Sequence, residues 1–137
     1  MSIHIEQITP ELTWRLRHEV LYPEIPIYKM WMDEDDDGYH FGAFTENQLV
    51  GVVSLFSKGL DYQFRKFAIH PSGQGQGVGK ALLDYVIAFA KAEGAERLWC
   101  NARVPAVGFY LKAGFKQTGE LFSRGGHDYE IMDLSLK

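Results

Sequence analysis

The sequence has little cysteine, no long apolar run and no excess of basic residues, and each shortage excludes a class of protein. A single cysteine, Cys100, cannot form an internal disulfide. No apolar run approaches membrane-spanning length, and no charged and then apolar leader opens the chain. The formal net charge of −4 disfavours a general affinity for nucleic acid. We therefore expect a cytoplasmic protein with no nucleic-acid and no membrane partner.

What the sequence does contain is typical of one globular domain over residues 1–137, with 46% hydrophobic and 14% aromatic residues. Alternation around Ile3 to Ile8 predicts a first strand, and Thr9 and Pro10 suit the start of a helix of about three turns. Prolines end that helix. The segment Ile27–Met32 that follows is short, and it is interpreted as a second helix or a lid.

Five consecutive acids, Asp33 to Asp37, precede Gly38 and match the opening of a calcium loop. The twelfth position of such a loop should be glutamate but is Phe44, so we favour a solvated acidic loop. An electrostatic attraction for a cationic substrate is the remaining interpretation. No cluster of histidine and cysteine has zinc spacing, and we expect no metal.

The rest of the chain alternates between strand and helix patterns. Apolar residues from Val78 to Phe89 recur at spacings of three and four, which predicts a helix that ends at Gly94. The strand before it and the strand after it then form a parallel pair. The predicted strands are Tyr39–Thr45, Leu49–Ser57, Leu60–His70, Arg97–Asn101, Phe115–Phe122 and Asp128–Leu136, with a second helix over Pro105–Ala113.

A glycine-rich stretch, Gln74-Gly75-Gln76-Gly77-Val78-Gly79-Lys80, joins the third strand to the long helix. Such a junction suits an anion, because helix N-terminal amides point into a loop with little side-chain bulk. A Walker loop is excluded by Gln74 and Ala81, which stand where glycine and a hydroxyl are needed. A dinucleotide fingerprint is excluded too, because no register supplies its last glycine.

The stretch resembles the pyrophosphate loop of the GNAT superfamily of acyl-CoA N-acyltransferases, through Gln74, Gly77 and Gly79. A second motif, Gly108 to Phe115, is also similar to that family, and the resemblance covers roughly Tyr39 to Phe115. It implies an α/β fold, α+β in some schemes, whose mixed, mostly antiparallel sheet has one central parallel strand pair and flanking helices. It also implies transfer of an acetyl group from acetyl-CoA to a primary amine by direct attack in a ternary complex.

The resemblance also assigns roles to residues. The main chain of Phe67, Ala68 and Ile69 would hold the pantetheine arm and polarise the acetyl carbonyl. Tyr110 would protonate the leaving thiolate, since a phenol with a pKa near 10 is protonated at neutral pH. Where many relatives carry an asparagine for the CoA arm this chain has Arg103, and Asn101 is the alternative. The residues expected at the pyrophosphate are Gln74, Gly75, Gln76, Gly77, Val78, Gly79 and Lys80.

The base that deprotonates the amine stays open. Some relatives use a glutamate on the strand before the loop, but Leu60–His70 contains none. Bulk water is one alternative, and the candidate side chains are His40, His70, Glu24 and His127. Cys100 lies in an apolar strand and is interpreted as a buried free cysteine rather than a nucleophile.

Two other functions remain open at this stage. One is a non-catalytic acetyl-CoA-binding regulatory or interaction module, and the other is phosphate binding unrelated to CoA. The acceptor class ranges from small amines, amino-acid derivatives and polyamines to a peptide or protein amine, with specificity expected from Pro23–Asp37 and Ser123–His127. An edge strand in the C-terminal hairpin can pair with a second copy, which favours a homodimer.

Overall fold

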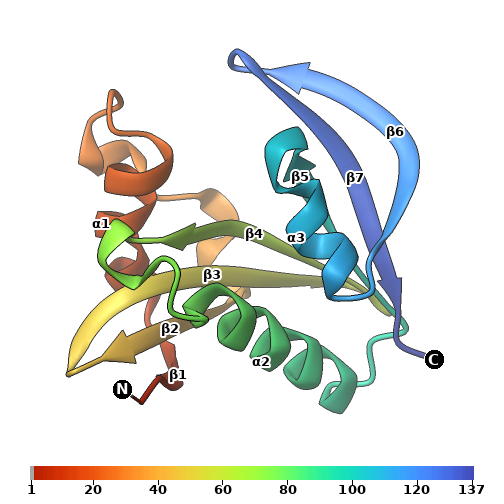
Figure 1. The fold of residues 1–137 in the computed structure, drawn as a ribbon, viewed down its shortest axis with the longest axis horizontal. Coiled ribbons are helices and arrows are strands. Elements are labelled where there is room, and N and C mark those ends of the chain that lie inside the picture. Colours follow the sequence, from red (N-terminus) through yellow and green to blue (C-terminus); the bar gives the residue numbers. More distant parts are fainter. Residues whose placement is uncertain (1) are drawn as a thin grey trace. The chain divides into compact units, whose positions relative to one another are not determined.

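The computed structural model describes residues 2–137, and seven strands form one sheet in the order β1-β2-β3-β4-β5-β7-β6 (Figure 1). One neighbouring pair, β4 with β5, is parallel, with Tyr62 opposite Leu98. The mixed, mostly antiparallel sheet with one parallel pair is therefore confirmed. The strands are β1 (His4–Ile8), β2 (Tyr39–Thr45), β3 (Gln48–Lys58), β4 (Asp61–Ile69), β5 (Arg97–Arg103), β6 (Lys116–Arg124) and β7 (His127–Ser135).

The described chain divides into two compact units. The first comprises residues 2–56 and Phe64–Val86, and the second comprises Ser57–Gln63 and Ile87–Lys137. In the first unit β1 pairs antiparallel with β2, and β2 pairs antiparallel with β3. Their turn places Glu46 and Asn47 at φ of 51° and 66°, the left-handed geometry that a tight hairpin needs. A cluster of Leu16, Val52 and Ala68 lies in the core of this unit.

The predicted first helix is a continuous helical segment of three kinds. A 3₁₀ turn over Pro10–Thr13 leads into α1 (Trp14–Leu16) and then a π-helical turn over Arg17–Leu21. Thr9 occupies the N-cap position before Pro10, as expected, but its side chain makes no capping hydrogen bond. Of the two interpretations of Ile27–Met32, the second helix is reduced to a 3₁₀ turn over Ile27–Lys29.

Helix α2 (Val78–Ala92) buries one apolar face, on which Val78, Leu82 and Val86 are at most 1% exposed. Tyr85 falls within the apolar series predicted for that face but is 38% exposed. The centroid of its ring lies 5.4 Å from that of Phe41. The helix ends as expected at Gly94, whose φ is 89°. No helix of residues 2–137 is both long and apolar enough to cross a membrane.

The second unit holds α3 (Val107–Lys112) and the strands β5, β7 and β6. Gly114 has a φ of 97° and closes α3, while Gly125 and Gly126 have φ of 58° and 80° in the β6–β7 turn. β5 alternates strictly between buried and half-buried residues, so Cys100 lies on its buried face. The predicted C-terminal hairpin and the buried free cysteine are both confirmed.

Candidate functional site

The loop between β4 and α2 is fixed by contacts of its first residues rather than of its tip. The amide of His70 donates to the carbonyl of Val50 at 2.8 Å, and its Nδ1 accepts from the Ser72 amide at 3.1 Å. Gly73 is buried, and a Cβ at that position would lie 3.2 Å from the Val50 side chain. Gln74 bends back, donating from Nε2 to the carbonyl of Ile69 at 3.1 Å. The contacts that order the loop are therefore made by residues 70 to 74 and do not use the main-chain amides at its tip.

The tip of the loop and the first turn of α2 present main-chain amides. The first helical hydrogen bond runs from the Ala81 amide to the Gly77 carbonyl at 3.0 Å, so the amides of residues 78 to 80 precede it and lack helical acceptors. Gly75 and Gly77 have φ of 75° and 80°, and a Cβ built on either meets no atom within 4 Å. A helix N-terminus beside open glycines binds an anion such as pyrophosphate, so these residues fit that part of CoA.

The last residues of β4 lie immediately before this loop. Ala68 is 1% exposed and packs in the core cluster, while Phe67 and Ile69 are half-buried. Lys66, just before them, has a φ of 57°, a left-handed conformation that non-glycine residues adopt at a cost of roughly 1–2 kcal/mol. The backbone thus leaves regular strand geometry directly before the three residues expected to hold the pantetheine arm.

Two expected site residues, Asn101 and Tyr110, belong to the second unit. Asn101 pairs with Ile131 in the β5–β7 ladder, and strand alternation puts it on the same half-buried face of β5 as Arg103. Both alternatives for the CoA arm therefore share one face. The loop residues and the end of β4 belong to the first unit.

Tyr110 lies on α3 and is 7% exposed. Its ring packs against Phe109 at 5.1 Å and Phe115 at 5.8 Å between ring centroids. Burial, and then the nearby Cys100, raises the pKa of the Tyr110 phenol above its ordinary 10.0, and burial raises the pKa of Cys100 to about 12. Both groups are therefore protonated at neutral pH, as a proton donor must be before it acts.

A buried polar network that the sequence did not predict lies in the first unit. Arg17, 1% exposed, donates to both carboxylate oxygens of Asp35 at 2.8 and 3.0 Å and to Ser54 Oγ at 2.8 Å. Burial raises the pKa of Asp35, but hydrogen bonds from Arg17 and the Met32 amide outweigh it, so the pKa lies below 3.8. The solvated acidic loop was wrong for Asp35, which lies in a 3₁₀ turn over Asp33–Asp37.

This network also occupies one candidate base, His40, which is 2% exposed. Its Nε2 lies 2.8 Å from the Asp35 carbonyl and must donate there, so Nδ1 accepts from Ser54 Oγ at 2.7 Å. With both ring nitrogens engaged, His40 is poorly placed to take a proton from a substrate. No group of residues in 2–137 has the side chains to hold a metal ion together.

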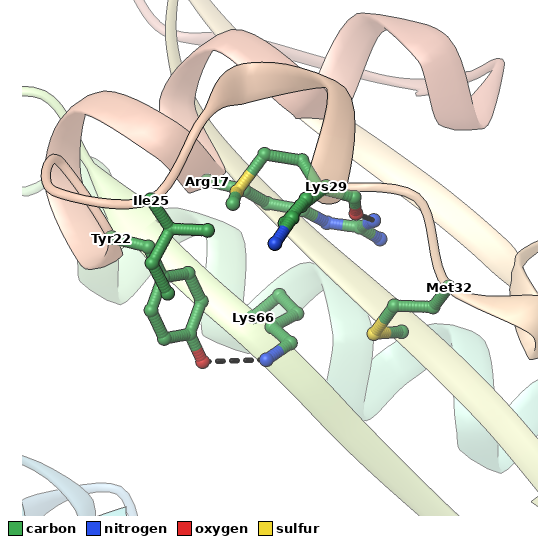
Figure 2. Close-up of a pocket in the computed structure, with 7 residues that line it drawn as sticks. Arg17, Tyr22, Ile25, Lys29, Met32 and Lys66 are labelled. Atoms are coloured by element: carbon green, nitrogen blue, oxygen red, sulfur yellow. Dashed lines mark hydrogen bonds between the residues drawn. The ribbon is translucent and has the colours of Figure 1, made fainter. Parts of the chain in front are cut away.

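Beside the network lies a pocket of about 240 Å³ (Figure 2). Arg17 lies in the first helical segment and Tyr22 directly follows it, Lys66 comes from β4, and the rest of the wall comes from the segment after the helix. Lys66 Nζ donates to the Tyr22 hydroxyl at 2.5 Å. Sequence reasoning placed acceptor specificity in Pro23–Asp37, which supplies part of this wall, but missed Lys66 and Tyr22. The lining residues are Arg17, Tyr22, Ile25, Lys29, Met30, Met32 and Lys66.

The chain resembles known proteins in sequence and in structure. In sequence, the chain is 28% identical over 133 residues to the uncharacterized N-acetyltransferase YitI of Bacillus subtilis (strain 168), covering 90% of this chain and 89% of that relative.

Solved structures show the fold. One similar structure is the ribosomal-protein-S18-alanine N-acetyltransferase from Escherichia coli, with a TM-score of 0.83 at 17% identity, covering 99% of this chain and 95% of that one. Another is a GNAT family acetyltransferase from Elizabethkingia anophelis with acetyl-CoA bound, with a TM-score of 0.75 at 20% identity and 97% of each chain covered. The model of the acetyltransferase (GNAT) family matches residues 5–115, well over half of the sequence. The chain belongs to the GNAT family of acetyltransferases.

Proposed function

We propose that this protein transfers an acetyl group from acetyl-CoA to a primary amine by direct attack, with both substrates bound together. The observation that carries the proposal is the row of amides from residue 78 to residue 80, beside the open Gly75 and Gly77. Acetyl-CoA supplies an activated thioester, and the protein's task is to bind it, to align an amine and to move protons.

The residues divide that task between them. Gln74 to Lys80 would hold the pyrophosphate through main-chain donors, and the main chain of Phe67 to Ile69 would pair with the pantetheine arm. Asn101 would add a side-chain contact to the arm. Tyr110, protonated and buried, would donate a proton to the departing sulfur.

Calorimetric titration with acetyl-CoA tests the binding part. A Gly77→Glu variant brings a carboxylate to the amide row, and a like charge 4–6 Å from a phosphate is worth about 3–4 kcal/mol at an effective dielectric constant of 20. We expect its Kd to rise more than about a hundredfold. Gly59→Glu is the matched control, because Gly59 also has a positive φ, 62°, and open space around it, but lies in the β3–β4 turn.

Unchanged affinity in Gly77→Glu, or equal losses in both variants, would contradict the assignment of the loop. A Tyr110→Phe variant tests the transfer part, since it keeps the ring among Phe109 and Phe115 and removes only the hydroxyl. We expect kcat to fall by about a hundredfold or more while the Kd of acetyl-CoA stays the same. Acetyl-CoA binding without transfer to any amine would instead favour the non-catalytic module.

A further inference from the structure

The pocket between the first helical segment and β4 has a chemical character that the family assignment does not explain. Three of its seven lining residues are cationic, and none of them is acidic. Arg17 is neutralised by its two hydrogen bonds to Asp35. Its buried Nε, however, has no hydrogen-bond partner within residues 2–137. The positive charge that remains in the pocket comes from two lysines.

Lys29 and Lys66 are those uncompensated charges. Neither forms an ion pair with a carboxylate in the part of the chain that the structure describes, residues 2–137. Lys66 Nζ is held instead by a neutral group, the Tyr22 hydroxyl, and lies 4.5 Å from the centre of that ring. Figure 2 shows both ammonium groups between Tyr22 and Met32. A half-buried lysine without a counterion is unfavourable, so an anion bound there would be favoured.

The backbone holds Lys66 in this place under strain. Its φ of 57° is the left-handed conformation, and such outliers persist only where the surroundings enforce them, often at ligand sites. Lys66 also directly precedes Phe67, the first of the three β4 residues expected to hold the pantetheine arm. An amine whose anionic part lies near Lys66 would therefore sit beside that strand.

The other wall of the pocket is apolar. Ile25, Met30 and Met32 line it, and methionine side chains adapt to varied apolar shapes. A volume of about 240 Å³ has room for a small acceptor. The five acids of Asp33–Asp37, for which attraction of a cationic substrate was the alternative interpretation, contribute none of the lining residues. One of them, Asp35, is bound to Arg17.

From these observations we infer that the acceptor is a small amine that carries its own anionic group, a carboxylate or a phosphate, held by Lys66 and Lys29, with an apolar part against Ile25 and Met32. This inference rests on the proposed acetyl transfer and names its substrate class. The two lysines would also disfavour the protonated form of the bound amine, which helps to produce the neutral nucleophile without a carboxylate base.

Acceptor pairs in which one member carries an anionic group and the other lacks it test the inference. Leucine is compared with leucinamide, and ethanolamine phosphate with ethanolamine, by kcat/KM at saturating acetyl-CoA. The amine of leucinamide is less basic than that of leucine, so a larger fraction of it is neutral and reactive. This difference by itself would favour leucinamide, which is opposite to the expected result. We expect kcat/KM of at least one member with an anionic group to exceed that of its partner without one by about tenfold or more, as one charge-assisted hydrogen bond supplies. The pair that shows it distinguishes carboxylate from phosphate.

Lysine variants locate the effect. Lys66→Gln and Lys29→Gln should each bring the ratio of kcat/KM values within a pair closer to one. Lys66→Arg should keep most of the wild-type ratio. Lys91→Gln removes a charge from an exposed lysine of α2 outside the pocket and should leave the preference unchanged. Lys29 lies in an exposed segment, so its variant reports on the pocket even where Lys66→Gln weakens folding. An equal or larger kcat/KM for both members that lack the anionic group would overturn the inference while leaving acetyl transfer intact.

A binding measurement separates the two proposals. Leucine, leucinamide, ethanolamine phosphate and ethanolamine are titrated calorimetrically into the protein saturated with CoA. Suppose that no amine is acetylated, that an amine with an anionic group binds at least about tenfold more tightly than its partner without one, and that Lys66→Gln abolishes the difference. The anion site then stands and the transferase proposal fails. Binding without a charge preference overturns the anion site whatever the transfer assay shows.

Discussion

Asp35→Asn is the substitution for which the structure allows the sharpest expectation. Asp35 is 1% exposed, and its two carboxylate oxygens accept from Arg17 at 2.8 and 3.0 Å. Oδ2 also accepts from the Met32 amide at 3.0 Å. Asparagine has nearly the same shape but one oxygen fewer and no charge. The change therefore leaves the Arg17 guanidinium, itself 1% exposed, buried without a counterion.

The expected loss follows from that orphaned charge. Removing one partner of a buried ion pair destabilises a protein by about 3–5 kcal/mol, mainly because the other charge remains desolvated. A chain of 137 residues loses very roughly 3–5 °C in Tm per kcal/mol, so Tm should fall by on the order of 10–20 °C. Asp84→Asn in α2 is the matched control, because its partner Lys80 is 79% exposed and such a pair contributes only a few tenths of a kcal/mol.

Urea denaturation followed by circular dichroism measures both variants, with acetyl-CoA binding as a check that the fold is kept. A third variant, Arg17→Met with Asp35→Leu, removes both charges and should regain most of the lost free energy of unfolding. A loss below about 1 kcal/mol in Asp35→Asn would refute the reasoning. So would a double variant at least as unstable as Asp35→Asn, because the penalty would then not come from an unpaired charge.

Three further predictions use the same purified protein. The pKa of Asp35 in the folded protein is lowered from 3.8, so its contribution to stability is complete above about pH 4 and is lost as pH falls through the folded pKa. Urea denaturation at pH 2–7 should therefore show that the difference in free energy of unfolding between wild type and Asp35→Asn shrinks towards low pH, and a constant difference would contradict this. Cys100 is 3% exposed with a pKa raised to about 12, so iodoacetamide should label it at pH 8 only as urea unfolds the chain, and rapid native labelling would count against its burial. Glu46→Asn should raise the free energy of unfolding by roughly 0.5 kcal/mol, because asparagine tolerates a φ of 51° better, and a decrease in urea denaturation would argue against that turn geometry.

Local patterns in the sequence predicted most of the fold. Alternation located the strands, and spacings of three and four located α2 from Val78 onward. Gly94 and Gly114 marked helix ends because their positive φ suits glycine. The glycine-rich loop was predicted because the positive φ of Gly75 and Gly77 suits residues without side chains. Each of these features depends on neighbours within a few residues.

The buried network depends on partners that are far apart in the chain, which is why it was missed. Asp35 meets Arg17 from 18 residues away and His40 meets Ser54 from 14. Nothing in five consecutive acids shows which of them turns inward. The length of the first helical segment was predicted, but its hydrogen-bonding type was not. A π-helical turn at Arg17–Leu21 changes the directions in which side chains point, and residue composition does not reveal such a turn.

Lys66 is the residue for which a signal was present in the sequence. Counting in twos along β4 puts it on the face of Tyr62, Phe64 and Ala68, all three of which are buried. A lysine in that series must either reach solvent or find a polar partner, and the structure shows the second outcome, with Tyr22. A lysine on a core-facing strand position is better explained by a ligand than by stability, since a neutral apolar residue would pack there without desolvating a charge. The strained φ at the same residue adds to the penalty, so two independent features lead to the anion site proposed above.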